Sequence, residues 1–76
     1  INHNRFQEFP GQILSLKKLK DLDFSNNDIT NLPYEITRLD KLLLLFIQQN
    51  PFDEEARETL ESMIHFYKGK DVSFNY

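Results

Sequence analysis

The chain has 76 residues, with 12 acidic and 9 basic side chains and a net charge of −3. A chain of this length holds at most one domain and buries only about 60% of the surface that its unfolded form exposes, so we expect marginal stability. The absence of cysteine excludes disulfides and thiolate metal sites. Acids and bases are interleaved along the sequence, which argues against the basic face that a nucleic acid needs, so we expect no nucleic-acid partner.

No segment has the length and apolar character of a transmembrane helix. The longest apolar run, residues 42–47, is far shorter than the roughly 18 residues that cross a bilayer, so we expect no membrane partner. The chain begins at Ile1 within a sequence repeat and without an initiating methionine. We therefore expect it to be the carboxy-terminal part of a longer protein.

An internal repeat organises residues 1–52. When the chain is shifted by 23 residues, apolar and asparagine positions coincide, and residues 19–41 form the one complete copy. The coinciding positions include Ile1, Phe24 and Ile47; Asn4, Asn27 and Asn50; and Phe6, Ile29 and Phe52.

Within the complete copy, Leu22 and Phe24 alternate with polar residues, which predicts a short strand with one buried face. The apolar residues of 29–39 are three or four positions apart, which favours a helical or turn-like return. Written as one unit, the repeat is LxxLxLxxNxLxxLPxxIxxLxx, and it resembles the leucine-rich repeat family in both residue type and spacing. The resemblance implies an α/β solenoid in which each copy adds a short strand to a parallel concave sheet and returns along the convex side.

Asn4, Asn27 and Asn50 recur where the chain leaves each expected strand. Backbone groups that leave a sheet lose their hydrogen-bond partners, and an amide side chain can replace them. In the family that the repeat resembles, this asparagine forms a ladder of side-chain hydrogen bonds to the backbone. We therefore assign these three residues a structural role in preference to ligand binding.

The repeat pattern ends after Phe52, and the next residues have the pattern of one helix. Asp53 is the expected N-cap, and Gly69 is the expected stop signal. We expect this helix to cap the open end of the core, and regard partner binding by it as the less favoured interpretation. Residues 53–76 would then complete the domain begun by residues 1–52. The expected apolar face consists of Ala56, Leu60, Met63, Ile64 and Tyr67.

The last segment, VSFNY, alternates apolar and polar residues again. It predicts a final edge strand that pairs in parallel with residues 45–47, with the preceding helix as the crossover connection. In the expected register, Ser73 lies beside Phe46, and Asn75 lies beside Gln48.

The sequence shows no nucleophile with a base at a telling spacing and no glycine-rich phosphate loop, so we expect no enzymatic activity and no cofactor. His3 and His65 are expected to be solvated. Asp21, Asp23 and Asp28 cluster within one copy of the repeat. We favour a solvated acidic patch over a cation site there, and expect no bound metal.

Leu43, Leu44 and Phe46 are apolar in columns where the preceding copy has charged residues. The register places Phe46 and Leu44 on the concave face, and an apolar spot with a polar rim is typical of a contact surface. The other interpretation is that Tyr76 folds over this spot. The expected partner-binding residues are Asp23, Ser25, Asp28, Leu44, Phe46 and Gln48.

These patterns predict a non-catalytic protein-interaction module that binds a protein partner through the concave face. The alternative is a purely structural end of a longer solenoid, or a targeting arm of a multidomain protein. The amino-terminal edge has no expected cap, so Leu22, Phe24 and Ile29 would face water or a neighbouring copy and promote self-association. Secreted animal members of the leucine-rich repeat family commonly have caps bracketed by cysteines. This chain lacks them, which favours an intracellular or bacterial setting.

Overall fold

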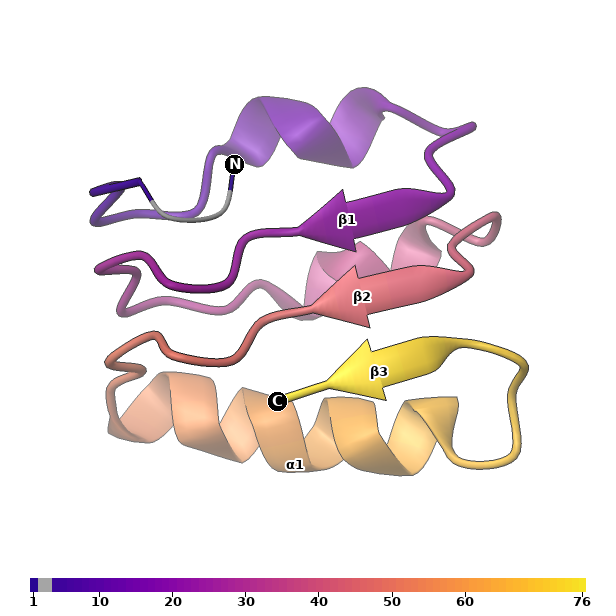
Figure 1. Ribbon diagram of the computed structural model, residues 1–76. Helices are drawn as coiled ribbons and strands as arrows, with labels where there is room; N and C mark the ends of the chain where they lie inside the picture. Colours follow the sequence, from indigo (N-terminus) through magenta and orange to yellow (C-terminus); the bar gives the residue numbers. More distant parts are fainter. Residues whose placement is uncertain (2–3) are drawn as a thin grey trace.

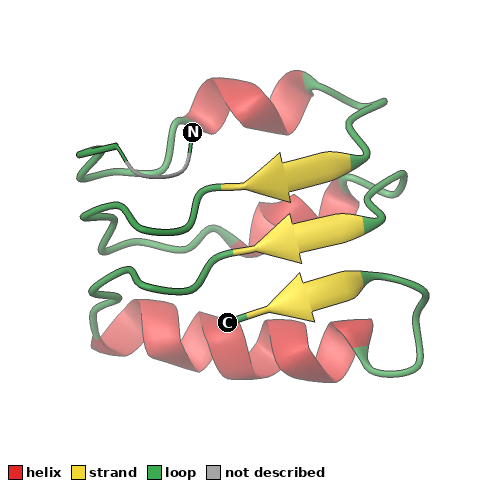
Figure 2. Cartoon of the chain, in the orientation of Figure 1, coloured by secondary structure: helices red, strands yellow, loops and turns green. Residues whose placement is uncertain are grey.

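The computed structural model describes residue 1 and residues 4–76, which form a small α/β unit (Figure 1). His3 lies outside the described residues. Three short parallel strands form one sheet in the order β1-β2-β3, namely β1 (Asp21–Asp23), β2 (Leu44–Phe46) and β3 (Ser73–Asn75). Figure 2 shows the helical segments behind the strands, and they are the 3₁₀ helices η1 (Gly11–Ser15) and η2 (Tyr34–Arg38) and the α-helix α1 (Glu54–Tyr67). The expected α/β class and parallel sheet are confirmed.

The 23-residue offset of the sequence sets the register of β1 and β2. The pairing continues beyond the strands, because the Phe24 amide donates to the Phe46 carbonyl and the Asn26 amide donates to the Gln48 carbonyl, each at 3.0 Å. The paired residues within the strands are Asp21 and Leu44, Leu22 and Leu45, and Asp23 and Phe46.

β3 pairs with β2 in parallel, and α1 is the crossover connection, as the sequence predicts. The predicted register is wrong by two residues, because Ser73 lies beside Leu44 and Asn75 lies beside Phe46. Phe74 lies opposite Leu45, the buried residue of β2, and the centroid of its ring lies 5.2 Å from that of Tyr67. A shift of two preserves the alternation of a strand, so Ser73 and Asn75 still lie on the expected face.

Helix α1 begins and ends as its sequence predicts. The Asp53 side chain accepts a hydrogen bond from the Ala56 amide at 2.8 Å, which satisfies one of the free donors of the first turn. Gly69 follows the helix with a φ of 82°, a conformation that glycine adopts without steric cost. Along the predicted apolar face, Ala56, Met63 and Tyr67 are buried, and the other two residues are partly buried.

One core fills the space between the sheet and the helical segments. Leu22, Phe24 and Ile29 are at most 4% exposed, so the expectation that they face water at the amino-terminal edge is wrong. Residues 4–19 cover them, and the Phe9 ring lies edge-on against Phe24 with centroids 5.0 Å apart. No helix in the described part of the chain is long and apolar enough to cross a membrane.

The end of α1 carries a buried hydroxyl group. The Oη atom of Tyr67 is buried and has no hydrogen-bond partner among the described residues. Burial raises the pKa of Tyr67 to about 12, and the neighbouring charge of Tyr34 adds to this effect. The neutral form is therefore the one that the folded chain accommodates.

We expect Tyr67→Phe to leave the free energy of unfolding near pH 8 unchanged or raised by about 1 kcal/mol, because the lost hydroxyl has no partner. In the native sequence, Tyr67 ionises near pH 10 when unfolded and near pH 12 when folded, so stability is complete below pH 10 and falls as the pH rises toward 12. Urea unfolding of both proteins through this interval measures the difference. The variant should lose less stability, Tyr76→Phe should behave like the native sequence, and equal losses in all three would contradict the assignment.

Candidate functional site

The sheet has one face on the core and one face without a helix in front of it (Figure 1). We call the second face the outer sheet face. Leu44 and Phe46 lie on its central strand and are half-buried. On the β1 side they are bordered by carboxylates, and on the β3 side by a hydroxyl and an amide. The outward residues of the three strands are Asp21, Asp23, Leu44, Phe46, Ser73 and Asn75.

The central strand β2 is apolar on both of its sides. Leu45 is fully buried in the core, whereas Leu44 and Phe46 point to the opposite side, because successive side chains of a strand alternate. A strand with apolar residues on both sides is typical of a sheet that is covered on both faces. The centre of the outer sheet face is therefore apolar, whereas the outward residues of β1 and β3 are charged or polar. Leu43 is separate from it, because it precedes the strand and is 55% exposed.

Tyr76 does not provide this cover. Its ring packs against Phe74 with centroids 5.0 Å apart, and Phe74 in turn packs against Tyr67 and the core. Tyr76 itself remains exposed. The interpretation in which Tyr76 folds over Phe46 is therefore not what the structure shows.

Two of the acidic and polar residues expected to bind a partner are already engaged within the chain. The Asp23 carboxylate accepts hydrogen bonds from the Ser25 amide at 3.0 Å and from the Ser25 hydroxyl at 2.7 Å. Ser25 is only 3% exposed, so little of its surface is available for contact with a partner. Asp21, which the prediction omitted, is exposed at the start of β1 and is the freer carboxylate of this face.

Gln48 lies two residues beyond Phe46 and is half-buried. Its Oε1 atom is buried and has no hydrogen-bond partner among the described residues. A buried acceptor without a donor costs about 1–3 kcal/mol. Among the described residues, Gln48 is therefore a predicted contact residue whose buried side-chain oxygen has no donor.

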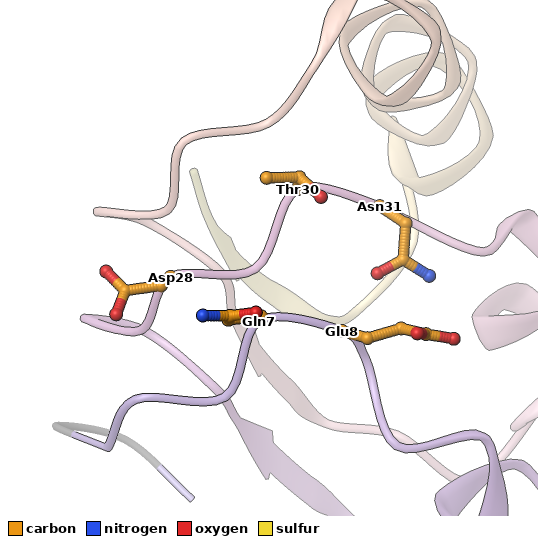
Figure 3. Close-up of a pocket in the computed structure, with 5 residues that line it drawn as sticks. All are labelled: Gln7, Glu8, Asp28, Thr30 and Asn31. Carbon is orange, nitrogen blue, oxygen red and sulfur yellow. The ribbon is translucent and has the colours of Figure 1, made fainter.

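Asp28 lies away from the outer sheet face, in the loop that follows β1. It borders an open hollow of about 590 Å³ at the side of the molecule where the strands end (Figure 3). No group of three His, Asp or Glu side chains within residues 4–76 could hold a metal ion. The side chains that line the hollow include no histidine and no lysine. The residues around the hollow are Gln7, Glu8, Asp28, Thr30 and Asn31.

Asn27 is buried just beyond β1, and its side chain forms hydrogen bonds with backbone groups at the end of β1 and in the first six residues of the chain. Its Nδ2 atom donates to the carbonyls of Phe24 at 2.9 Å, Ser25 at 3.1 Å and Ile1 at 2.8 Å. Its Oδ1 atom accepts from the Phe6 amide at 3.4 Å. One side chain therefore joins the exit of β1 to the preceding segment of the chain.

Asn50 has an equivalent set of partners 23 residues later. Its Nδ2 atom donates to the carbonyls of Ile47 and Phe24, both at 3.0 Å, and of Gln48 at 3.5 Å. Its Oδ1 atom accepts from the Ile29 amide at 3.1 Å. The exits of β1 and β2 are thus tied to each other by this amide.

The residue before each of these asparagines has the same unusual backbone conformation. Asn26 has a φ of 58°, and Gln49 has a φ of 64°. The two strand exits therefore share hydrogen bonds and backbone shape. Asn4, the third predicted member of the ladder, is exposed.

Replacing Asn27 by alanine should lower the free energy of unfolding by about 1–3 kcal/mol, because the carbonyls of Phe24 and Ser25 lose a buried donor. Asn27→Asp should also destabilise the chain, since a carboxylate accepts but cannot donate. Urea unfolding measures both effects. Asn75→Ala, at an exposed amide of the edge strand, is the matched control and should cost less than about 0.5 kcal/mol. Equal effects at the two positions would exclude the structural role of Asn27.

No protein-family model matches the chain, and no solved structure matches it.

Proposed function

We propose that the chain is a non-catalytic protein-interaction module and that its outer sheet face binds the partner. The observation that carries this proposal is the outward placement of Leu44 and Phe46 on the central strand, with polar residues on both neighbouring strands. An aromatic residue at the centre of a patch with a polar rim is the usual composition of an interaction hot spot. A partner that covers Phe46 removes its remaining apolar surface from water, which favours binding.

The charges around this patch define the chemistry of the partner. Asp21 and Asp23 border one side of Phe46, whereas Ser73 and Asn75 on the other side are neutral. A partner with an apolar side chain flanked by a lysine or arginine complements this arrangement, since charge pairs at a rim guide association and orientation.

We further propose that residues 1–52 are leucine-rich repeats of a curved solenoid, and that α1 and β3 close its carboxy-terminal end. Three repeated features support this proposal. The paired residues of β1 and β2 are 23 positions apart, Asn27 and Asn50 have equivalent backbone partners, and Asn26 and Gln49 share one conformation. The outer sheet face would then be the concave face.

The binding proposal can be tested with a displayed library of random peptides that is selected on the immobilised chain. The selected peptides should be enriched in basic residues next to aromatic or aliphatic ones. Phe46→Asp should weaken their binding by roughly 30-fold, which corresponds to about 2 kcal/mol. Titration by fluorescence anisotropy measures these affinities.

Two matched controls locate the effect. Leu43→Asp changes a more exposed apolar residue of the same run and should leave binding intact. Asp21→Lys should shift the selected peptides toward acidic residues, whereas Asp28→Lys, away from the sheet, should not. If folded Phe46→Asp binds as well as the native sequence, the outer sheet face is not the binding surface. If no peptide is selected, the alternative of a purely structural element is preferred.

Self-association through the amino-terminal edge is also part of the proposal. Ile1 and Phe6 are exposed at this edge, although the core behind them is buried. A second copy that covers these side chains should produce concentration-dependent sedimentation, and Phe6→Glu should abolish it. Tyr34→Glu, at an exposed ring on the helical side, is the control. A single monomeric species up to high micromolar concentration would rule out self-association.

A further inference from the structure

The lysines of the chain are gathered at one edge of the molecule. All six lie in the three loops that lead into the strands, residues 16–20, 39–43 and 68–72, and all six are exposed. Because the strands are parallel, these loops lie together at the edge where the strands begin, which is on the right in Figure 1. We call this the lysine edge. It consists of Lys17, Lys18, Lys20, Lys41, Lys68 and Lys70.

The charge of this edge is opposite to that of the whole chain. The three loops contain two acidic residues, Asp40 and Asp71, so their net charge is +4. The rest of the chain has three arginines and ten acidic residues, a net charge of −7. The interleaving seen along the sequence therefore becomes a separation of charge in the folded molecule. Such a separation concentrates a positive potential at one edge.

Exposed apolar side chains lie in the same loops. Leu16 is 51% exposed, and Leu43 is 55% exposed. They come from adjacent loops, one leading into β1 and the other into β2. The lysine edge therefore combines cations with aliphatic side chains, and its three loops contain no aromatic residue.

We infer that the lysine edge binds peripherally to the surface of an anionic lipid bilayer. Lysines near an anionic membrane are attracted to its surface, and aliphatic side chains such as Leu16 and Leu43 can enter the boundary between headgroups and acyl chains. This inference departs from the expectation of no membrane partner, which rested on the lack of a membrane-spanning segment, because association with the bilayer surface does not need such a segment.

The residue types of the lysine edge favour a bilayer over an acidic protein or a nucleic acid as the partner. Protein interfaces are depleted in lysine and enriched in arginine, yet the three loops contain no arginine. Arginine suits fixed, bidentate contacts, whereas the mobile ammonium group of lysine suits headgroups that have no fixed geometry. Single-stranded nucleic acids are bound by exposed aromatic side chains that stack on bases. The three loops contain none, and the Phe66 ring, whose centroid lies 4.5 Å from the Lys70 ammonium group, is half-buried.

The lysine edge and the outer sheet face are different surfaces. The edge lies where the strands begin, whereas Leu44 and Phe46 project from the side of the sheet. A bilayer at the edge would leave the outer sheet face open to a partner. The membrane inference therefore does not rest on the proposed binding function.

Co-sedimentation with vesicles tests the inference. The chain should bind vesicles of phosphatidylcholine that contain about 30% phosphatidylserine at least tenfold more strongly than vesicles of phosphatidylcholine alone. Binding should weaken steeply between about 50 mM and about 500 mM salt, because exposed charges are screened. Equal binding to the two kinds of vesicle would overturn the inference.

A pair of charge-matched variants assigns the binding to this edge. Lys17→Glu with Lys20→Glu removes the net positive charge of the three loops. It should weaken binding by at least about 25-fold, since each lysine near an anionic surface strengthens binding about fivefold and the new carboxylates are repelled. Arg5→Glu with Arg57→Glu changes the net charge of the chain by the same amount elsewhere and should weaken binding less than threefold. Equal losses in the two variants would show that net charge, and not this edge, drives the association.

Two further measurements complete the test. Leu43→Asp should weaken vesicle binding several-fold while leaving the binding of selected peptides intact, which separates this inference from the proposed function. Polyaspartate and a short duplex DNA are the competing probes. If either binds through the same lysines more tightly than the anionic vesicles do, the assignment of a bilayer is wrong and the edge is a site for that polyanion.

Discussion

The backbone carbonyls at the ends of β1 and β2 need donors that the sheet no longer supplies, and two asparagine amides provide them. The carbonyl of Phe24 accepts from Asn27 at 2.9 Å and from Asn50 at 3.0 Å, so a single backbone group joins adjacent exits. Buried backbone groups must be paired, and these bonds leave little freedom to slide one strand along the other. The register of the sheet, and with it the outward position of Phe46, depends on this constraint.

The same register also creates the two surfaces to which we assign function. Parallel pairing brings the loops that lead into each strand to one edge, and it brings the outward residues of each strand to one face. The lysines lie in the loops at that edge, and Leu44 and Phe46 lie on that face. A chain of this size can therefore present two chemically different surfaces in two directions, with the core between them kept for stability.

Local signals in the sequence predict the local structure well. The apolar alternation around Leu22 and the capping residue Asp53 depend on near neighbours, and both strand and helix form as they predict. The register of β3 could not be read in this way, because it is decided by the packing of Phe74 on Tyr67. The burial of Ser25 depends on its bonds to Asp23, and the lysine edge depends on three loops that are distant in sequence. These features depend on contacts and neighbours that arise only in the folded chain.

The exits of β1 and β2 have similar backbone conformations, but the free-energy cost of that conformation differs between them. Asparagine tolerates the left-handed conformation of Asn26, whereas the same conformation at Gln49 costs about 1 kcal/mol. The preceding residue, Gln48, adds a buried oxygen without a donor. Strain and an unmet hydrogen bond thus coincide at the exit of β2, two and three residues beyond Phe46. The fold therefore gives up stability directly beside the face proposed for binding.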